Sequence, residues 1–209
     1  MRDNRKHRTI SDEPGRAQST RENLVSSAIR VIARDGYVAA TTQAVLDESG
    51  LSRGSLLFQF PTRLDLMTAA ARESIRRSLT RIDAAMSAHG DDALAALETY
   101  PDILWTIQNE EAAIAYTEIQ LASRWDRDLF DNLKDIIEKV DKVIAARLLE
   151  LAEGCGLPGL DQLASEVHIL INFTQGLAIN ARLAPDPGKV ANALAVAKRH
   201  FLSQLHSRV

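Results

Sequence analysis

The chain has 209 residues and a formal net charge of −3, with 45% hydrophobic and 25% charged residues. This composition excludes a disordered tail protein, a collagen and a small fold stapled by disulfides. The single cysteine, Cys155, excludes an internal disulfide and a zinc site built from cysteines alone. No window approaches the roughly 18 uninterrupted apolar residues of a membrane span. The polar, charged N-terminus is unlike a secretory signal, so we expect a cytoplasmic protein with no membrane partner.

The charge is unevenly distributed along the chain. Residues 1–63 contain ten Lys and Arg against seven Asp and Glu, whereas the remainder contains fifteen against twenty-one. A basic N-terminal quarter on an acidic body predicts a polyanionic partner at that end alone. A solubilising tail is the alternative that the charge by itself leaves open.

The pattern of apolar residues predicts helices throughout and no strand. A capping box of Ser19 and Glu22 is expected to open the first helix, because Pro14 and Gly15 keep the preceding segment from continuing as helix. Gly36 ends this helix. Residues 1–18 are therefore expected to form a flexible basic arm that follows the backbone of the polyanionic partner; a start without any such contact is the alternative.

Two short helices come next, and each has a recognisable cap. Thr41 or Thr42 caps a helix that ends near Ser49. A tight turn at 50–52 leads to another helix from Arg53 to about Phe60.

Six more helices are predicted, which makes about nine in an all-α fold. Pro61 stops the third helix, and Thr62 with Asp65 caps a long fourth helix that reaches about His89. Further caps predict helix starts at positions 91–92, 109, 126, 161 and 186–187. Pro101 is expected to bend or split the fifth helix.

The two short helices at 41–60 carry the clearest motif. Val45, Leu46 and Leu51 can lock them at a steep angle, while Gly50 allows the turn between them. Two short helices joined in this way are typical of a helix-turn-helix, whose second helix lies in the major groove of DNA. Periodicity places Leu56, Leu57 and Phe60 on the inner side of that helix and four polar residues outside: Ser52, Arg53, Ser55 and Gln59.

These residues extend into a longer pattern that resembles the DNA-binding domain of the TetR (tetracycline-repressor-like) family. The pattern runs from Leu24 to Leu66 and is carried in unbroken register by Ala28, Gly36, Thr41, Val45, Gly50, Leu51, Ser52, Gly54, Ser55, Leu56, Phe60, Arg63 and Leu66. Three positions depart from the family. Phe58 replaces a Tyr whose hydroxyl reaches a phosphate, Arg63 replaces a Lys, and Leu46 replaces an Ala.

The resemblance implies a three-helix DNA-binding domain over 19–66, followed by a larger helical domain over 67–209 that binds an effector and pairs two subunits. Arg and Gln can bond guanine and adenine, so the base edges are assigned to Arg53, Ser55 and Gln59. Phosphates are assigned to Thr42, Gln43, Ser52 and Arg63. Phe58 belongs to the same DNA-facing set, although it cannot make the usual hydrogen bond.

The body offers candidates for an effector cavity. The few aromatic residues gather in the predicted fifth to seventh helices, and polar residues of the eighth join them. An apolar cavity could be lined by Trp105, Tyr116, Gln120, Trp125, His168, Asn172 and Phe173. Ordinary core positions are the alternative for each of them. As a set they favour a hydrophobic or aromatic effector over a charged one.

The last two predicted helices suggest a homodimer. The eighth helix is apolar on more than one side, and the ninth carries Val190, Leu194, Ala197, Phe201 and Leu205. We expect the two helices to form a four-helix interface with a second copy, or alternatively to close the core of the monomer. A two-fold dimer would place two reading helices about one DNA turn apart on a palindromic operator.

Enzyme motifs are absent from the sequence, including the phosphate-binding loop, the dinucleotide fingerprint and His-Glu-x-x-His. The run His89–Asp92 is explained by a helix stop and a cap, so no metal, cofactor or catalytic residue is predicted. The sequence thus predicts a ligand-responsive repressor, not an enzyme. The alternative is an all-helical small-molecule-binding protein or enzyme without DNA binding.

Overall fold

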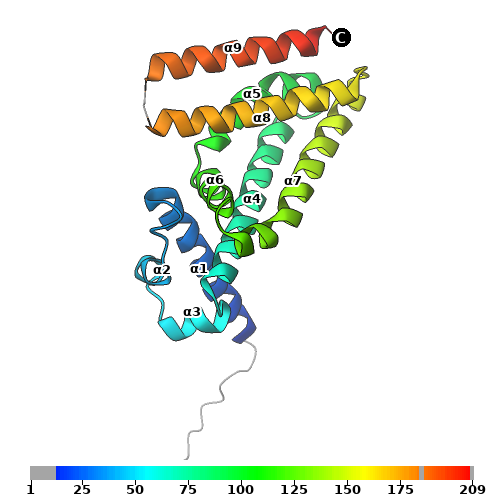
Figure 1. Ribbon diagram of the computed structural model, residues 1–209. Helices are drawn as coiled ribbons and strands as arrows, with labels where there is room; N and C mark the ends of the chain where they lie inside the picture. The colour runs from blue at the N-terminus through cyan, green and yellow to red at the C-terminus, as the bar shows by residue number, and fades with distance from the viewer. Residues whose placement is uncertain (1–12, 184–185, 208–209) are drawn as a thin grey trace, which may run out of the picture.

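A computed structural model describes residues 13–183 and 186–207, and within them the chain is helical without a strand. The described residues form nine helices, as predicted: α1 Glu13–Asp35, α2 Thr42–Ser49, α3 Arg53–Gln59, α4 Arg63–Ser87, α5 Ala93–Gln108, α6 Glu111–Ser123, α7 Arg127–Gly154, α8 Leu160–Leu183 and α9 Pro187–His206. The three N-terminal helices occupy one end of the molecule, and α8 and α9 lie side by side across the other (Figure 1). None of the described helices is long and apolar enough to cross a membrane.

The predicted caps of the short helices are confirmed. The Thr41 hydroxyl accepts from the Ala44 N–H at 3.1 Å, and the Ser52 hydroxyl accepts from the Ser55 N–H at 3.2 Å. Gly50 ends α2 with a φ of 67°, a left-handed conformation that glycine adopts without strain. Such local hydrogen bonds fix the turn between α2 and α3 independently of the body.

Two helix starts differ from the prediction. Helix α1 begins at Glu13, not at Ser19, so Pro14 lies in its first turn, where a proline costs no hydrogen bond. Residues 13–18 of the expected arm are therefore helical, whereas residues 1–12 lie outside the described residues. Asn109 ends α5 and does not start α6. Pro101 is buried inside an α5 that remains one helix.

The buried apolar side chains form two cores. The first joins α1, α2 and α3 to α4, α6 and the start of α7, through residues such as Leu24, Ile32, Val45, Leu56, Met67, Ile119 and Leu133. The second joins α5, the end of α7, α8 and α9, through residues such as Leu97, Leu148, Leu163, Phe201 and Leu205. The first core extends across the predicted boundary at 66/67, so the N-terminal helices pack directly on α6.

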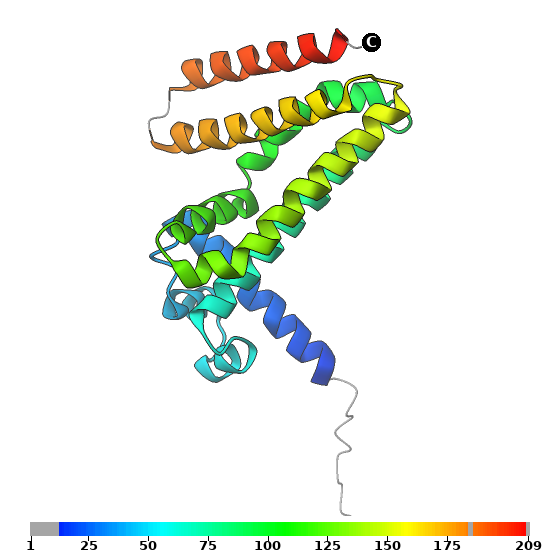
Figure 2. The same ribbon diagram turned by 45° about the vertical axis from the view of Figure 1, so that its right-hand side comes forward.

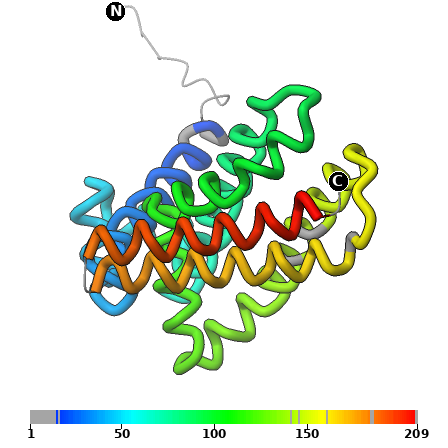
Figure 3. Tube along the Cα trace, turned by 90° about the horizontal axis from the view of Figure 1, so that it is seen from above, coloured from blue at the N-terminus to red at the C-terminus, as the bar shows by residue number. Residues whose placement is uncertain are grey.

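Helix α4 links the two ends of the molecule. It starts beside α3 and runs alongside α7 towards α5 (Figure 2). Viewed from above, α8 and α9 form an antiparallel pair that lies over the other helices (Figure 3).

Candidate nucleic-acid interface and ligand cavity

Helix α3 presents a mixed surface to the solvent. Arg53 is exposed at its first position, and no hydrogen bond or ion pair to another described residue holds it. Leu56 and Phe60 are buried, as expected. Leu57, which was expected to face inward, is 48% exposed, and the neighbouring Phe58 is 81% exposed. A seven-residue helix on a small core can bury only one narrow stripe, so Leu57 falls outside it.

The remaining polar candidates lie around this helix. Ser52 is exposed, and its hydroxyl lies 2.9 Å from that of the half-buried Ser55. Gln43 is exposed on α2 and donates to Asp47 at 2.7 Å, while Thr42 is half-buried. Together with Arg53, these side chains lie at the amino ends of two helices, where the helix dipole favours an anion.

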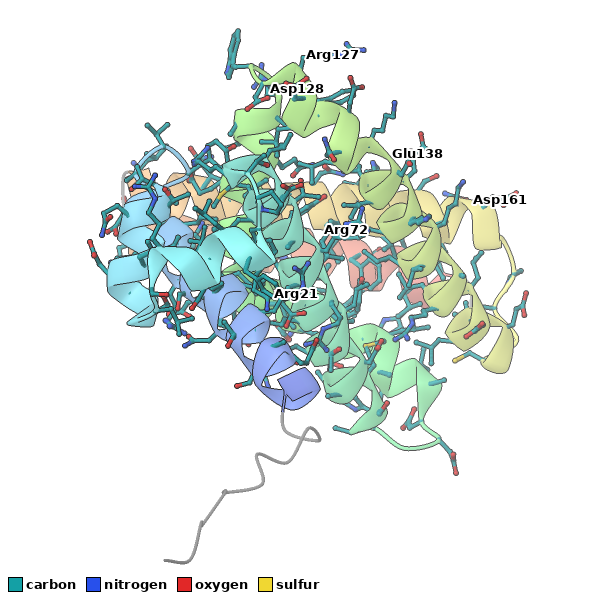
Figure 4. All side chains as sticks on the ribbon, turned by 90° about the horizontal axis from the view of Figure 1, so that it is seen from below. Arg21, Arg72, Arg127, Asp128, Glu138 and Asp161 are labelled. Atoms are coloured by element: carbon teal, nitrogen blue, oxygen red, sulfur yellow. The ribbon has the colours of Figure 1, made fainter. Side chains whose placement is uncertain are left out.

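Gln59 is held by the start of α1. Its side-chain amide donates to the Ala17 carbonyl at 3.1 Å. A second hydrogen bond joins the same two helices, because Arg21 on α1 donates to the Gln59 carbonyl at 3.2 Å. The Arg21 guanidinium also lies 4.3 Å from the centre of the Phe60 ring. Figure 4, which views this end from below, shows Arg21 beside α1 and α3. In this structure Gln59 fastens α3 to α1.

Arg63 is held in a similar way, by the loop between α1 and α2. Its guanidinium donates to the carbonyls of Ala40 at 3.1 Å and of Tyr37 at 2.6 Å, and it stacks 4.3 Å from the centre of the Tyr37 ring. The planar fork of arginine can bond two carbonyls at once, which the ammonium of lysine does less well. The replacement of lysine by arginine was the one sequence signal that could have suggested this role.

A cavity of about 270 Å³ lies in the body and is lined by α4, α5, α6, α7 and α8. Four of the predicted ligand residues line it: Tyr116, Gln120, His168 and Asn172. The remaining lining residues are Ile75, Ser78, Leu79, Ile82, Leu104, Ile107, Gln108, Ala113, Ile137, Val140, Ile144, Ile171 and Gln175. None of these side chains is a carboxylate, a lysine or an arginine.

A polar group that sequence analysis did not select lies in the cavity wall. The Gln175 amide donates to the Gln120 side-chain oxygen at 3.0 Å and to the Thr117 hydroxyl at 3.1 Å, and so joins α8 to α6. His168, Asn172 and Gln175 are spaced at i, i+4 and i+7, which places them on one face of α8. That spacing was the signal that could have found Gln175.

Three predicted ligand residues do not line this cavity. Trp105 is half-buried on α5. Trp125 is 86% exposed at the turn between α6 and α7, and Phe173 is 36% exposed on the outer side of α8. Phe173 instead borders a shallow apolar groove between α8 and α9, together with Ile169 and Val196.

The exposed face of α8 and α9 differs from the expected interface in one respect. Ile169 and Val196 are 58% and 57% exposed. Phe201 and Leu205, which were expected in the interface, are buried in the second core of the monomer. They face inward because α9 packs its own apolar stripe against α5 and α8.

The residues considered as metal ligands have structural partners. His89 Nε2 lies 2.9 Å from the Thr99 hydroxyl, and Asp92 caps α5 by accepting from the Ala95 N–H at 2.9 Å. Burial and the nearby Asp92 raise the pKa of the Cys155 thiol, so the thiolate is disfavoured.

The geometry agrees with comparisons to known proteins. Residues 24–70 match the model of bacterial regulatory proteins of the tetR family. An HTH-type transcriptional regulator of Mycobacterium tuberculosis is 29% identical over 180 residues, which cover 82% of this chain and 87% of that protein. A nicotine-responsive transcriptional repressor of Paenarthrobacter nicotinovorans is 25% identical over 135 residues, 64% of this chain and 69% of that protein. A TetR transcriptional regulator structure from Chloroflexus aurantiacus has a TM-score of 0.70 at 18% identity, covering 93% and 98% of the chains.

The fold and the helix-turn-helix surface define an all-helical transcriptional regulator, and the two relatives are regulators by description. The match over α1 to α4 falls on the same residues that build this surface. Residues 24–70 thus match the TetR family model, and the all-helical fold of the chain is that of solved TetR regulators.

Proposed function

We propose that this protein is a ligand-responsive repressor that binds a palindromic operator as a homodimer and is released by a small, largely hydrophobic or aromatic effector. One observation carries the proposal. Helix α6 contributes Tyr116 and Gln120 to the cavity, and the preceding residues Ala115 and Ile119 to the core shared with α1. A ligand that moves α6 therefore moves the packing surface of the DNA-binding helices.

The DNA-binding role rests on the exposed side of α3 and the start of α2. Arg53 reads a base edge, because it is exposed and unengaged and a guanidinium bonds guanine through two hydrogen bonds. Ser55 lies on the same helix, and Thr42, Gln43 and Ser52 bind phosphates beside it. Gln59 and Arg63 act by positioning α3 and the preceding loop, given their contacts within the protein. Phe58 adds an apolar contact.

The homodimer forms through the outer face of α8 and α9. Ile169 and Val196 leave an apolar surface exposed, and Phe173 adjoins it. Exposed apolar patches of this kind mark association surfaces. A two-fold axis between paired α8 and α9 helices would set two copies of α3 about 34–36 Å apart, one turn of DNA.

The repressor is released from the operator if the effector binds more tightly to a conformation of the dimer that the operator binds less tightly. Effector binding would shift the equilibrium between two spacings of the α3 helices, and its differential affinity for the two states sets the size of the shift. The cavity wall belongs to α4, α5, α6, α7 and α8, so it borders both the link to the DNA-binding end and the proposed dimer helix. The nicotine-responsive relative supports an effector of small size.

In this proposal, residues 19–66 bind DNA, and residues 67–209 bind the effector and form the dimer. Residues 1–18 add basic contacts to the DNA. The arm before Glu13 is assigned to DNA by its charge alone, through Arg2, Arg5, Lys6 and Arg8.

Selection of duplex DNA from a random pool by the purified protein tests the proposal. We expect a palindrome whose half-sites are about 10 base pairs apart from centre to centre. Enrichment without symmetry would contradict the dimer, and no enrichment would leave an all-helical binding protein without DNA recognition. Deletion of residues 1–12 should lower the salt dependence of log affinity if the arm contacts phosphates.

The variant Ile169→Asp with Val196→Asp tests the interface. Both side chains are exposed, so the monomer should fold while the dimer dissociates in sedimentation experiments. Loss of the bivalent contact should weaken palindrome binding at least about a hundredfold. Asn132→Asp, at an exposed position on α7, serves as the control. A dimer that survives the double substitution would place the interface elsewhere.

A further inference from the structure

A second cavity of about 370 Å³ lies next to the first, between α4, α5 and α7. The two cavities share three lining residues, Leu79, Ile82 and Ile144. Tyr100, on α5, lines only the second cavity. The sequence placed Tyr100 among the aromatic residues of the body, but no role in binding follows from the TetR resemblance or from the proposed function.

The hydroxyl of Tyr100 is a buried polar group without a hydrogen-bond partner among the described residues. The side chain is 1% exposed. Burial raises the pKa of this hydroxyl, so it keeps its proton and remains a donor. A buried polar group without a partner destabilises a folded protein, so such groups are rare and call for a specific explanation.

The surroundings of Tyr100 define the partner that would satisfy it. The other lining side chains are mainly apolar, such as Met86 and Leu148. The charged Asp83 and Arg147 also line the cavity, but they form an ion pair with each other. An anionic ligand would lose its hydration there without gaining a free cationic partner. The third charged residue of the lining, Glu150, is exposed and hydrated, so it offers a cation little more than water does.

We propose that the second cavity is a ligand compartment for an uncharged apolar group that carries one hydrogen-bond acceptor, a carbonyl oxygen or a ring nitrogen, which accepts from the Tyr100 hydroxyl. The shared wall of Leu79, Ile82 and Ile144 makes this compartment an extension of the proposed effector site. A role of this compartment in regulating DNA binding rests on the proposed function. The binding of a small-molecule probe to the compartment does not depend on the proposed function.

Two matched pairs of probes test the compartment. Quinoline differs from naphthalene by one ring nitrogen, and acetophenone differs from isopropylbenzene by its carbonyl oxygen. For the wild-type protein we expect each acceptor-bearing member to bind about two- to tenfold more tightly than its hydrocarbon partner, measured by calorimetry or competition NMR. In Tyr100→Phe this preference should disappear while the hydrocarbons still bind.

Tyr116→Phe is the matched control, because it removes a hydroxyl from the first cavity alone. It should leave the preference for acceptors intact. Tyr100→Phe should also retain or raise the melting temperature, since it removes an unsatisfied polar atom from the interior. A lower melting temperature would mean that the hydroxyl already has a partner and would overturn the proposal.

The proposal is also overturned if none of the four probes binds, if the acceptor preference persists in Tyr100→Phe, or if Tyr116→Phe abolishes it. Release of operator DNA by saturating probe is measured in parallel. If ligands bind with the expected preference and none releases DNA, the proposed function fails while the compartment stands.

Discussion

The two hydrophobic cores of this molecule differ in what surrounds them. In the first core, most side chains, among them Ile32, Val45 and Ile119, have no exposed surface. The second core is bordered by the cavity that Tyr100 lines and, on its outer side, by the exposed residues Ile169 and Val196. Close packing transmits a displacement, whereas cavities and exposed apolar surface accept a partner. Under the proposed function, we therefore expect the end that carries α1 to α3 to move as a unit and the other end to bind the effector and the second subunit.

The largest effect is expected from truncating one side chain in each core. Ile119→Ala and Leu163→Ala should each lower the free energy of unfolding by about 2–5 kcal/mol, because both side chains are fully or almost fully buried. Only Ile119→Ala should also weaken the coupling between effector and operator binding, since Ile119 joins α6 to α1. Denaturant titrations and operator binding with and without effector measure the two quantities. An equal loss of coupling in both variants would refute the distinction between the cores.

Arg53→Ala should confine its effect to the DNA-binding end. We expect operator binding to weaken by about 1–3 kcal/mol and the preference at one base pair to relax. Effector affinity and unfolding free energy should stay unchanged, because Arg53 is exposed and unengaged. Binding to a set of single-base operator variants provides the measurement. A uniform loss on all of them, with a smaller salt dependence, would instead make Arg53 a phosphate contact.

Arg63→Lys should act on stability. Lysine keeps the charge but cannot maintain both carbonyl bonds and the stacking on Tyr37, so we expect a loss of about 1–2 kcal/mol of unfolding free energy. The salt dependence of DNA binding should stay the same. If stability is unchanged and DNA affinity drops on every sequence, Arg63 binds a phosphate as the family resemblance implies.

Glu73 makes pH-dependent contacts within α4, one of them with Arg77, the residue that reaches α1. Hydrogen bonds from Arg76 and then from Arg77 lower the pKa of this carboxyl from 4.5 to about 2, and Arg77 also reaches the Ser26 hydroxyl on α1. A lowered pKa stabilises the folded state above pH 4.5, and the contribution is lost as the pH falls towards 2. Because the arginines are partly exposed, we expect Glu73→Gln to cost no more than about 1 kcal/mol at pH 7. Urea titrations should show this difference shrinking at pH 3, and a constant difference would contradict the assignment.

The caps and turns were predictable because their causes are local in sequence. Thr41, Ser52 and Thr62 each bond a backbone N–H three residues away, so their helix starts were predicted correctly. Pro14 misled the prediction of α1, because proline breaks a helix interior but suits its first turn. Local rules alone do not decide which of the two applies.

The site was less predictable because its contacts join distant segments. Gln59 meets Ala17, and Arg63 meets Tyr37 and Ala40, across 23 to 42 positions of sequence. In the body, His168 and Asn172 lie on one face of α8 and line the cavity, and the helical periodicity of the sequence indicates such a shared face. Trp125 was selected for its aromatic ring, and ring type does not reveal which side of a helix faces inward.

The exposed ring of Phe58 has a consequence for the chemistry of the operator. A phenyl ring offers DNA no hydrogen bond, and the apolar feature of the major groove is the 5-methyl group of thymine. A regulator with 81% of this side chain exposed on α3 should therefore favour a thymine opposite it. Replacing thymine by uracil in the operator removes only the methyl group, and the affinity lost should vanish in Phe58→Ala. The protein would then distinguish two nucleobases that pair identically with adenine.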